Sequence, residues 1–394
     1  MNNTKDKLVL VLGSSATALA IVRELNRIPD TSIVVASLEK GCANTSRFVK
    51  ESWVLSDLSD LTKKIEQVSR RYNIVLMPSS DLFVEWVCHN AAVLNQFCFF
   101  DDCYLDQIAL KLLDKETFSS LASENNLLQP QVYSIDDFSQ QSEVIESYPI
   151  FIKPKIIHQK RSDIPGKKGM VIRNKEQWLD WFSRYKSSQK DWLAQEIILG
   201  SEDNIMLFVG CFDSKYQLID CFTARKLRQS PIGFGSASLV ITEFNQDIVD
   251  MSSKLLSKVG YSGVCSGEFK WCGRRNQWVV IEFNPRPALW YSVATASGAL
   301  IVSQVISRKL NLENIPIKNN KAKVLWRYGL KDLFSQWKYF KNKNFVLPKP
   351  KVKPHLKFNY KRTYPVFTLA DIKPFFAELR TYITKLIKRI LRMT

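Results

Sequence analysis

The sequence predicts an α/β protein with a parallel sheet near its N-terminus, followed by mixed strands and helices and then a basic, partly helical C-terminal region. Apolar runs that alternate with helical patterns indicate the parallel sheet, and paired strand patterns indicate the mixed region. The chain has 394 residues, of which 45% are hydrophobic and 24% are charged. That composition is typical of a globular protein with a buried core and two or three domains.

The N-terminal part reads as a strand, a turn and a helix, repeated. Leu8–Leu12 is a buried parallel strand by its composition, Gly13-Ser14-Ser15 is a turn, and Ala16–Asn26 has a helical pattern. Further strands are predicted at Ile33–Ala36 and Ile74–Met77. Ligand-binding loops are expected at the carboxyl ends of such strands. The GxGxxG and GxxxxGK[ST] fingerprints are both missing, so any nucleotide must be held in another way.

The middle of the chain carries strands that pair locally. A helix is predicted at Gln107–Leu128, and a polar, basic loop at Lys155–Lys168. The predicted strands and hairpins are Ile150–Lys153, Trp192–Ile198, Met206–Phe212 with Gln217–Thr223, and Val264–Trp271 with Gln277–Phe283. Helices are predicted at Ile248–Val259 and from Val293 to Lys309. This pattern is typical of an α+β region.

Cysteine and histidine usage excludes several classes of site. The eight cysteines form no CxxC pair, so we expect reduced core cysteines. The three histidines are far apart in sequence, and they form neither zinc spacing nor a Ser–His–Asp pattern. The sequence has no apolar run long enough to span a bilayer and no signal-peptide pattern, and a cytoplasmic location is therefore expected.

The net charge of +18 is concentrated at the C-terminal end. Residues Pro316–Thr394 contain 20 Lys and Arg against 3 Asp and Glu, a balance of +17. The preceding part of the chain is therefore almost neutral. A strongly basic region indicates a polyanionic partner or an anionic surface.

The strongest chemical signal is Glu268 followed by Glu282-Phe283-Asn284-Pro285-Arg286. Side chains alternate along a strand, so Glu282 and Asn284 lie on one face, where Glu268 on the preceding strand can meet them. Two carboxylates and an amide oxygen are suitable ligands for Mg²⁺. The alternative is one acid paired with Arg286 and the other solvated.

Three further segments have polar groups suited to phosphate or nucleotide binding. Lys153 ends an apolar strand and Lys115 lies on a helix, and each can contact a phosphate as a point charge. The strand Trp192–Ile198 leads into an acidic linker that can offer backbone groups to a purine and an acid to a ribose. Arg225-Lys226-Leu227-Arg228 precedes the Gly-containing loop Pro231–Ser236. Solvated surface charges and an ordinary strand and turn are the alternatives.

In this order, the segments resemble the ATP-grasp superfamily, and the resemblance covers about residues 1 to 310. It implies an α/β N-terminal pre-ATP domain followed by a two-lobed α+β ATP-grasp fold, here with a basic C-terminal helical extension. The implied domains are 1–110, 111–315 with lobes of about 111–193 and 194–315, and 316–394. The loop after Lys153 departs from the family pattern, because it contains only Gly166 where many members are Gly-rich. Gln195 stands where many members have an acid.

The resemblance also implies roles for individual residues. ATP and Mg²⁺, or Mn²⁺ in its place, are the implied cofactors. The implied phosphate ligands are Lys115 and Lys153, the adenine pocket is lined by Gln195, Glu196 and Ile198, and Glu202 contacts the ribose. The implied metal ligands are Glu268, Glu282 and Asn284, and the implied catalytic residues are Arg286, Arg225 and Lys226, with Arg225 and Lys226 facing the same centre.

Within the superfamily, the chain is similar to the carboxylate–amine ligases that include D-aspartate ligases. The segment Ala224–Arg228 and the late Tyr364–Pro374 carry this similarity. It implies an ADP-forming reaction through an acyl phosphate, with a small-molecule or lipid-linked carboxylate and an amine as substrates, in cell-envelope or surface-polysaccharide synthesis. Such enzymes are often dimers. The alternatives are carboxylation or thioester formation on the same fold, a non-catalytic member, and a non-enzymatic polyanion-binding protein, although nucleic acid binding leaves the acidic pair unexplained.

The last segment predicts a basic amphipathic helix from Pro374. Its apolar positions recur at helical spacing: Phe375, Phe376, Leu379, Tyr382, Ile383, Leu386, Ile387 and Ile390. Such a helix either lies on an anionic membrane surface at the cytoplasmic face or packs its apolar stripe on the body of the protein.

Overall fold

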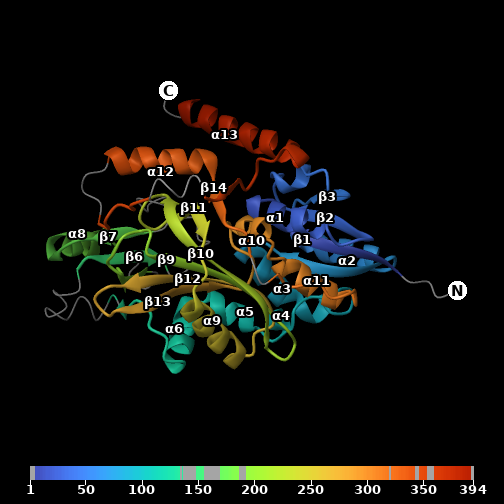
Figure 1. The fold of residues 1–394 in the computed structure, drawn as a ribbon, viewed down its shortest axis with the longest axis horizontal. Helices are drawn as coiled ribbons and strands as arrows, with labels where there is room; N and C mark the ends of the chain where they lie inside the picture. The colour runs from blue at the N-terminus through green and yellow to red at the C-terminus, as the bar shows by residue number, and fades with distance from the viewer. Residues whose placement is uncertain are drawn as a thin grey trace.

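The computed structural model describes residues 5–133, 135, 148–154, 169–185, 192–318, 321–341, 346–352 and 359–391, and these residues form three sheets. Figure 1 shows the N-terminal sheet on one side, a large sheet in the centre and a small sheet on the other side. The last two helices lie along the top of this view. The predicted loop at Lys155–Lys168 lies outside the described residues.

The N-terminal sheet is parallel, with the strand order β3-β2-β1-β4. Gly13 follows β1 with a φ of +124°, and a Cβ built there would lie 2.3 Å from Ser79 Oγ, so this turn requires glycine. The strands and helices are β1 (Asp6–Leu12), α1 (Ala16–Leu25), β2 (Thr31–Ser37), β3 (Glu51–Val54), α2 (Ser59–Ser69), β4 (Tyr72–Pro78) and α3 (Asp81–Leu94). The alternation in the sequence is therefore confirmed as a parallel α/β unit.

The small sheet is antiparallel, with the order β5-β8-β6-β7. Its elements are β5 (Val132–Tyr133), β6 (Ile150–Pro154), β7 (Met170–Ile172), α8 (Lys175–Tyr185) and β8 (Trp192–Glu196). Buried Trp178 and Trp181 of α8 stack on each other, and Trp181 meets Trp192 edge-on, which fixes this helix on the sheet. The single helix predicted at Gln107–Leu128 is in fact two, α5 (Ile108–Leu113) and α6 (Lys115–Glu124), because Asp114 caps the second one.

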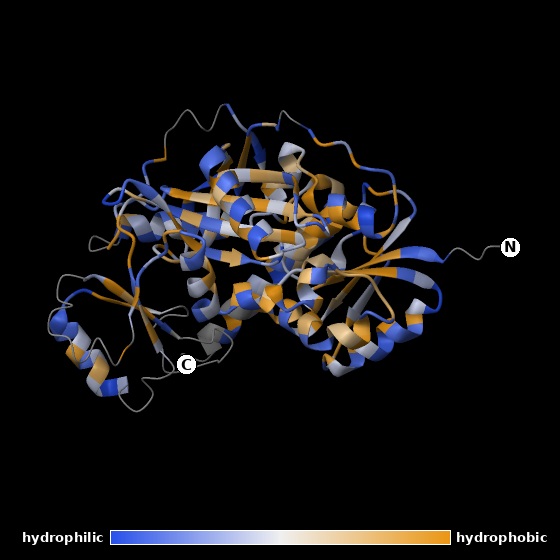
Figure 2. Cartoon of the chain, turned by 90° about the horizontal axis from the view of Figure 1, so that it is seen from below, coloured by the Kyte–Doolittle hydropathy of each residue, from blue (hydrophilic) through white to orange (hydrophobic). Residues whose placement is uncertain are grey.

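The large sheet has the order β13-β12-β9-β10-β11-β14-β15. Figure 2 shows hydrophobic strands at the centre of the molecule. Its strands are β9 (Ile205–Phe212), β10 (Leu218–Ser230), β11 (Ser236–Thr242), β12 (Gly263–Cys272), β13 (Gln277–Asn284), β14 (Val324–Arg327) and β15 (Lys361–Thr363). Helices α9 (Gln246–Lys258), α10 (Ser292–Ser297) and α11 (Ile301–Lys309) pack against it.

The C-terminal region differs from the helical extension expected after residue 316. Its strands β14 and β15 lengthen the large sheet, with β14 antiparallel to β11 and parallel to β15. The helix α12 (Gly329–Lys341) was missed, whereas α13 (Lys373–Leu391) confirms the predicted terminal helix. The strands β14 and β15 have only four and three residues, and such short segments in a basic stretch carry too weak a signal to be distinguished from a linker.

Two buried carboxylates connect the N-terminal unit to the rest of the chain. Glu24 of α1 accepts hydrogen bonds from the Tyr291 hydroxyl at 2.5 Å and the Thr295 hydroxyl at 2.7 Å. Asp371, just before α13, accepts from Arg23 Nε at 3.0 Å and from the Ser46 hydroxyl at 2.8 Å. The start of α13 is therefore fixed to the N-terminal unit. The eight cysteines are all free, as expected for core cysteines.

Candidate active site

The predicted acid pair lies on neighbouring strands of the large sheet. Glu268 of β12 is directly opposite Glu282 of β13, and Asn284 lies two residues further along β13. Asn284 Nδ2 donates to Glu282 Oε1 at 3.1 Å. Among the described residues there is no group of three or more His, Cys, Asp or Glu side chains placed to hold a metal. The donor set here is two carboxylates and one amide oxygen, which fits Mg²⁺ because that cation keeps several water ligands.

Arg286 is positioned by the N-terminal unit. Its Nε donates to Asp81 Oδ1 at 2.6 Å, and its Nη2 donates to Asn284 Oδ1 at 3.3 Å. The ion pair of Arg286 is thus with Asp81. The alternative interpretation of the sequence required an ion pair between Arg286 and one of the two acids, Glu268 or Glu282, and the structure does not contain it among these residues. Asp81 is the first residue of α3, just after the carboxyl end of β4. Ligands bind at the carboxyl ends of parallel strands, so this position could have identified Asp81 as a site residue from the sequence.

Two lysines approach the acid pair from other elements. Lys153 of β6 donates from Nζ to Gln195 Oε1 at 2.5 Å. The pKa of Lys153 is lowered to about 8, mainly by burial and then by the charge of Lys115, and the charge of Glu282 opposes both effects. Burial likewise lowers the pKa of Lys115, at the start of α6, against the field of Glu282 and Asp114. The structure therefore brings Lys115, Lys153 and Glu282 into one electrostatic cluster.

The two cations predicted on β10 point to opposite faces of the large sheet. Lys226 is buried and donates to Glu268 Oε1 at 2.5 Å. Arg225 lies on the other face, where its Nε donates to Glu243 Oε2 at 2.7 Å and its Nη1 donates to the Asp203 carbonyl at 3.1 Å. Strand alternation makes this unavoidable for adjacent residues. The expectation that Arg225 faces the same centre as Lys226 was therefore wrong, and only Lys226 lies beside the acid pair.

The predicted adenine-pocket segment covers the end of β8 and the residues just after it, where the small sheet meets the large one. Ile198 is buried and packs against Cys272 and Val279 of the large sheet. The Glu196 carboxylate accepts from Arg275 Nη2 at 2.7 Å, an ion pair that connects β8 to the β12–β13 hairpin. Within this segment, the Gln195 side chain contacts Lys153 of the lysine cluster. The Glu196 side chain instead forms the ion pair with Arg275 that links the small sheet to the large one.

Glu202 is already engaged inside the protein. Its carboxylate is fully buried and accepts a hydrogen bond from the Tyr339 hydroxyl of α12. Burial raises the pKa of Glu202. Contact between Glu202 and a ribose therefore stays a prediction. It requires a nucleotide to reach a side chain that is buried against Tyr339 of α12.

The small sheet is also in contact with the glycine-containing loop that follows β10. Phe151 of β6 stacks on Phe234 of that loop, with ring centroids 4.3 Å apart. Lysine ammonium groups, two carboxylates, an amide and a guanidinium thus converge where the two sheets meet. Such a set suits a polyphosphate and a divalent cation, because the cations and the metal neutralise its charge.

The chain has the ATP-grasp fold. Solved structures of similar fold include N5-carboxyaminoimidazole synthetase from Staphylococcus aureus, with a TM-score of 0.63, 13% identity and coverage of 87% of this chain and 88% of that one. The biotin carboxylase domain of Hydrogenobacter thermophilus 2-oxoglutarate carboxylase, solved with MgADP and bicarbonate, has a TM-score of 0.61 at 14% identity and covers 81% of this chain and 73% of that one.

Among curated proteins, the chain is similar to D-aspartate ligase of Enterococcus faecium (strain Aus0004). The two are 20% identical over 242 residues, which span 58% of this chain and 56% of that enzyme. The chain thus matches little more than half the length of this relative. No family model matches the sequence.

Proposed function

We propose that the protein is an ATP-dependent, ADP-forming carboxylate–amine ligase. The observation that carries the proposal is the acid pair Glu268 and Glu282 facing Lys115 and Lys153 where two sheets of an ATP-grasp fold meet. The 20% identity to a D-aspartate ligase supports a C–N bond-forming reaction over the alternatives. Carboxylation is the second candidate, because the solved neighbours include a carboxylase domain bound to bicarbonate.

The residues divide into those that hold ATP and those that hold the cation. Lys115 and Lys153 would bind the phosphates, and Gln195 would orient Lys153 through the hydrogen bond at 2.5 Å. The backbone of residues 195–198 would hold the adenine. Glu268, Glu282 and Asn284 would bind Mg²⁺, which when bound neutralises phosphate charge and orients the transferred group.

The reaction would proceed in two balanced steps. A carboxylate oxygen of the substrate attacks the γ-phosphorus of ATP, the bond to the β-phosphate oxygen breaks, and ADP leaves. An amine then attacks the carbonyl carbon of this acyl phosphate, phosphate leaves with the bonding electrons, and the amine loses a proton. Arg286, oriented by Asp81, and Lys226, held by Glu268, would stabilise the negative charge on the transferred group.

The biological setting is part of the proposal. The relative's name places aspartate among the candidate carboxylates, and a role in envelope or surface-polysaccharide synthesis would follow from a lipid-linked acceptor. We propose a cytoplasmic enzyme that acts as a monomer or a homodimer. None of the helices in the described part of the chain is long and apolar enough to cross a membrane.

The test is ADP release with Mg²⁺-ATP across a panel of amino acids, uronic acids and amine acceptors, with Glu282→Ala as the inactive comparison. Release that needs both a carboxylate and an amine, and is lost in the variant, supports the ligase. Release that needs bicarbonate instead supports carboxylation. If neither ADP release nor Mg²⁺-ATP binding is detected, the assignment of the acid pair is wrong.

The lowered pKa of Lys153 predicts a pH-dependent affinity for ATP. The side chain is charged below pH 8 and neutral above it, because its pKa lies at about 8 in the free protein. The dissociation constant of Mg²⁺-ATP should therefore rise between pH 7 and pH 9, by up to about tenfold per pH unit above the pKa. Calorimetric titration of the wild type and Lys153→Met tests this expectation. The variant should bind more weakly at pH 7 and show a flatter profile, and an equally steep profile would contradict the role of Lys153.

A further inference from the structure

Helix α12 turns its apolar side chains outward and its polar side chains inward. Its buried residues are Asp332, Ser335 and Tyr339. The solvent-facing residues recur at helical spacing and are between 46% and 83% exposed: Leu330, Leu333, Phe334, Trp337 and Phe340. A surface helix of a globular protein normally shows the opposite arrangement. This stripe therefore has the pattern of a surface that another apolar phase covers.

Helix α13 has a second outward apolar stripe. Its exposed apolar residues, between 36% and 59% exposed, are Phe376, Leu379, Ile383 and Ile387. Phe375 packs against the core cluster that includes the N-terminal unit, and the Tyr328 hydroxyl donates to the Glu378 carboxylate. One side of α13 therefore packs on the body of the protein, as one interpretation expected, while an apolar stripe faces outward and the membrane contact of the other interpretation stays a prediction.

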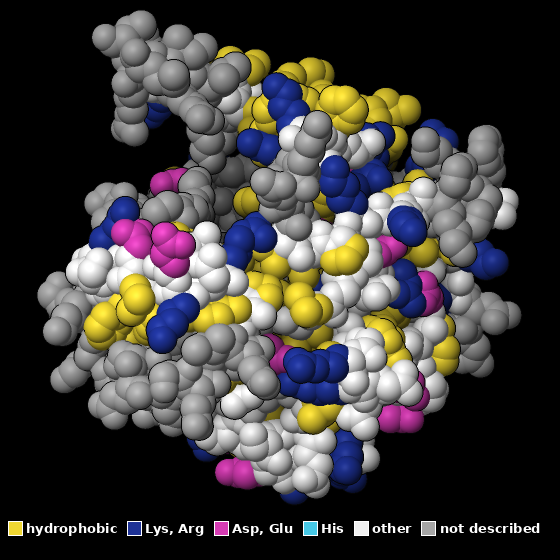
Figure 3. All heavy atoms as spheres, turned by 90° about the vertical axis from the view of Figure 1, so that its left-hand side faces the viewer, with side chains coloured by type: hydrophobic (Ala, Val, Ile, Leu, Met, Phe, Trp, Pro, Cys, Tyr) yellow, Lys and Arg dark blue, Asp and Glu magenta, His cyan; other side chains and the backbone are white. Residues whose placement is uncertain are grey.

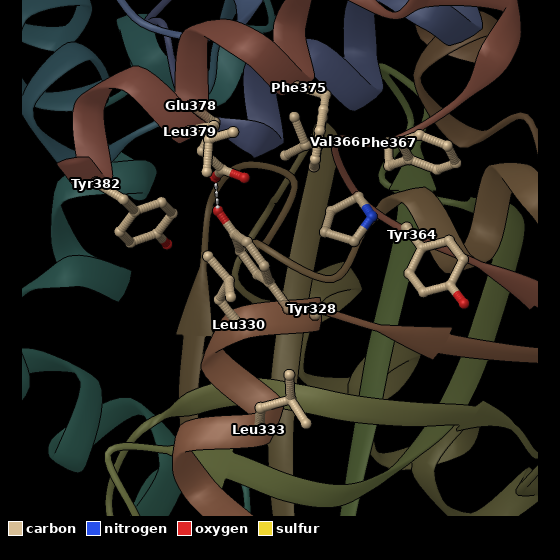
Figure 4. Close-up of a pocket in the computed structure, with 12 residues that line it drawn as sticks. Tyr328, Leu330, Leu333, Tyr364, Val366, Phe367, Phe375, Glu378, Leu379 and Tyr382 are labelled. Carbon is tan, nitrogen blue, oxygen red and sulfur yellow. Dashed lines mark hydrogen bonds between the residues drawn. The ribbon is translucent and has the colours of Figure 1, made fainter.

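The two stripes lie on the same face of the molecule. Figure 1 shows α12 and α13 along the top, and Figure 3 shows hydrophobic and basic side chains gathered along the same upper edge. A cavity of about 440 Å³ lies between the helices, and residues of both line it, including Leu330, Leu333, Phe375 and Leu379. Figure 4 shows Leu330 and Leu379 beside the Tyr328–Glu378 hydrogen bond, with Phe375 and Leu333 further from it. We call this face, made of α12, α13 and the cavity, the apolar face.

Among the described residues of α12 and α13, the exposed charged side chains are all basic. The acids of the two helices are Asp332 and Glu378. Asp332 is buried against Arg228 and Arg327, and Glu378 accepts from Tyr328. The basic side chains that lie exposed on the two helices are Lys338, Lys341, Lys373, Arg380 and Lys388. Exposed hydrocarbon beside exposed cations is complementary to a layer with anionic head groups and an apolar interior.

We propose that the apolar face binds the surface of an anionic lipid membrane, with the stripes of α12 and α13 inserted into the head-group region. This inference does not rest on the ligase reaction, because it uses none of the site residues. A second copy of the chain is a poorer occupant, since two basic faces would repel each other. A nucleic acid would leave the apolar stripes in water.

Vesicle flotation of the full-length chain tests the proposal. The protein should float with vesicles of phosphatidylcholine and phosphatidylglycerol in equal parts, and far less with phosphatidylcholine alone. The double variant Trp337→Glu/Ile383→Glu should lower binding by at least about tenfold, because each change places a carboxylate in the head-group layer. Val93→Glu, which changes an equally exposed apolar residue of α3, is the matched control and should bind like the wild type.

Trp337 gives a second readout that does not depend on an added charge. Brominated phosphatidylcholine in the anionic vesicles should quench part of the tryptophan fluorescence, and Trp337→Phe should remove that part while still floating. Equal flotation of the double variant and the wild type would overturn the proposal. So would a protein that binds neither vesicle, or one whose apolar face is covered by a stable dimer in light scattering that the double variant abolishes. ADP release is measured without vesicles, so its result tests the ligase proposal independently of whether the protein binds a membrane.

Discussion

Replacing Glu282 by alanine is expected to reduce substrate-dependent ADP release on the order of 100-fold or more. Glu282 is exposed and opposite Glu268, and its field acts on both Lys115 and Lys153. Its removal takes away a proposed cation ligand and a negative charge that acts on both lysines. The turnover number should therefore fall, and the affinity for Mg²⁺ should fall with it.

Because Glu282 is exposed, a loss of activity in Glu282→Ala can be separated from a loss of stability. An exposed side chain contributes little to stability, so the melting temperature of Glu282→Ala should stay close to that of the wild type. Glu66→Ala on α2 is the matched control, because it removes an exposed carboxylate far along the chain from the acid pair. Turnover of Glu282→Ala within a few-fold of the wild type, once a substrate pair is known, would show that this acid holds no essential cation.

Strands and acids that follow a strong local pattern could be predicted from the sequence. The runs at Leu8–Leu12 and Ile74–Met77 are apolar because both faces of a strand in a covered parallel sheet are buried. In the structure they form the neighbouring parallel strands β1 and β4. The short hairpin brings Glu268 close to Glu282, but its register alone would place Glu268 opposite Ile281, and a bulge between Glu268 and Phe269 shifts the partner to Glu282. These parts of the site depend on few distant residues.

The parts that could not be predicted depend on distant partners. Asp81 and Arg286 are 205 residues apart, and only the packing of the N-terminal unit brings them together. The stripe of α12 has the spacing of a helix that packs on a core, so its pattern could not reveal that the stripe faces outward. For Arg225, in contrast, the alternation of a strand already contained the answer, and the expectation disregarded it.

Replacing Asp332 by alanine is expected to destabilise the C-terminal region by about 3–5 kcal/mol, because it removes the acid from a buried ion-pair network. Asp332 is 0% exposed. Its carboxylate accepts from Arg228 Nε and Nη2 at 2.7 and 2.8 Å, and from Arg327 Nε at 2.7 Å. The alanine would leave both guanidinium groups without this partner, and α12 would lose its main polar attachment to β10 and β14.

The loss should appear as a lower melting temperature and as earlier proteolysis within α12, before the N-terminal unit is cut. Asp332→Asn keeps one acceptor oxygen but loses the charge and the second acceptor, and its stability should lie between those of the wild type and Asp332→Ala. Asp180→Ala removes the acid of an exposed ion pair with Arg184 on α8 and should change stability by less than about 1 kcal/mol. Since Tyr339 of the same helix donates to Glu202, release of α12 should also expose Glu202. If Asp332→Ala melted like Asp180→Ala, α12 would be held by its apolar contacts alone, and the buried ion pairs would contribute little to its position.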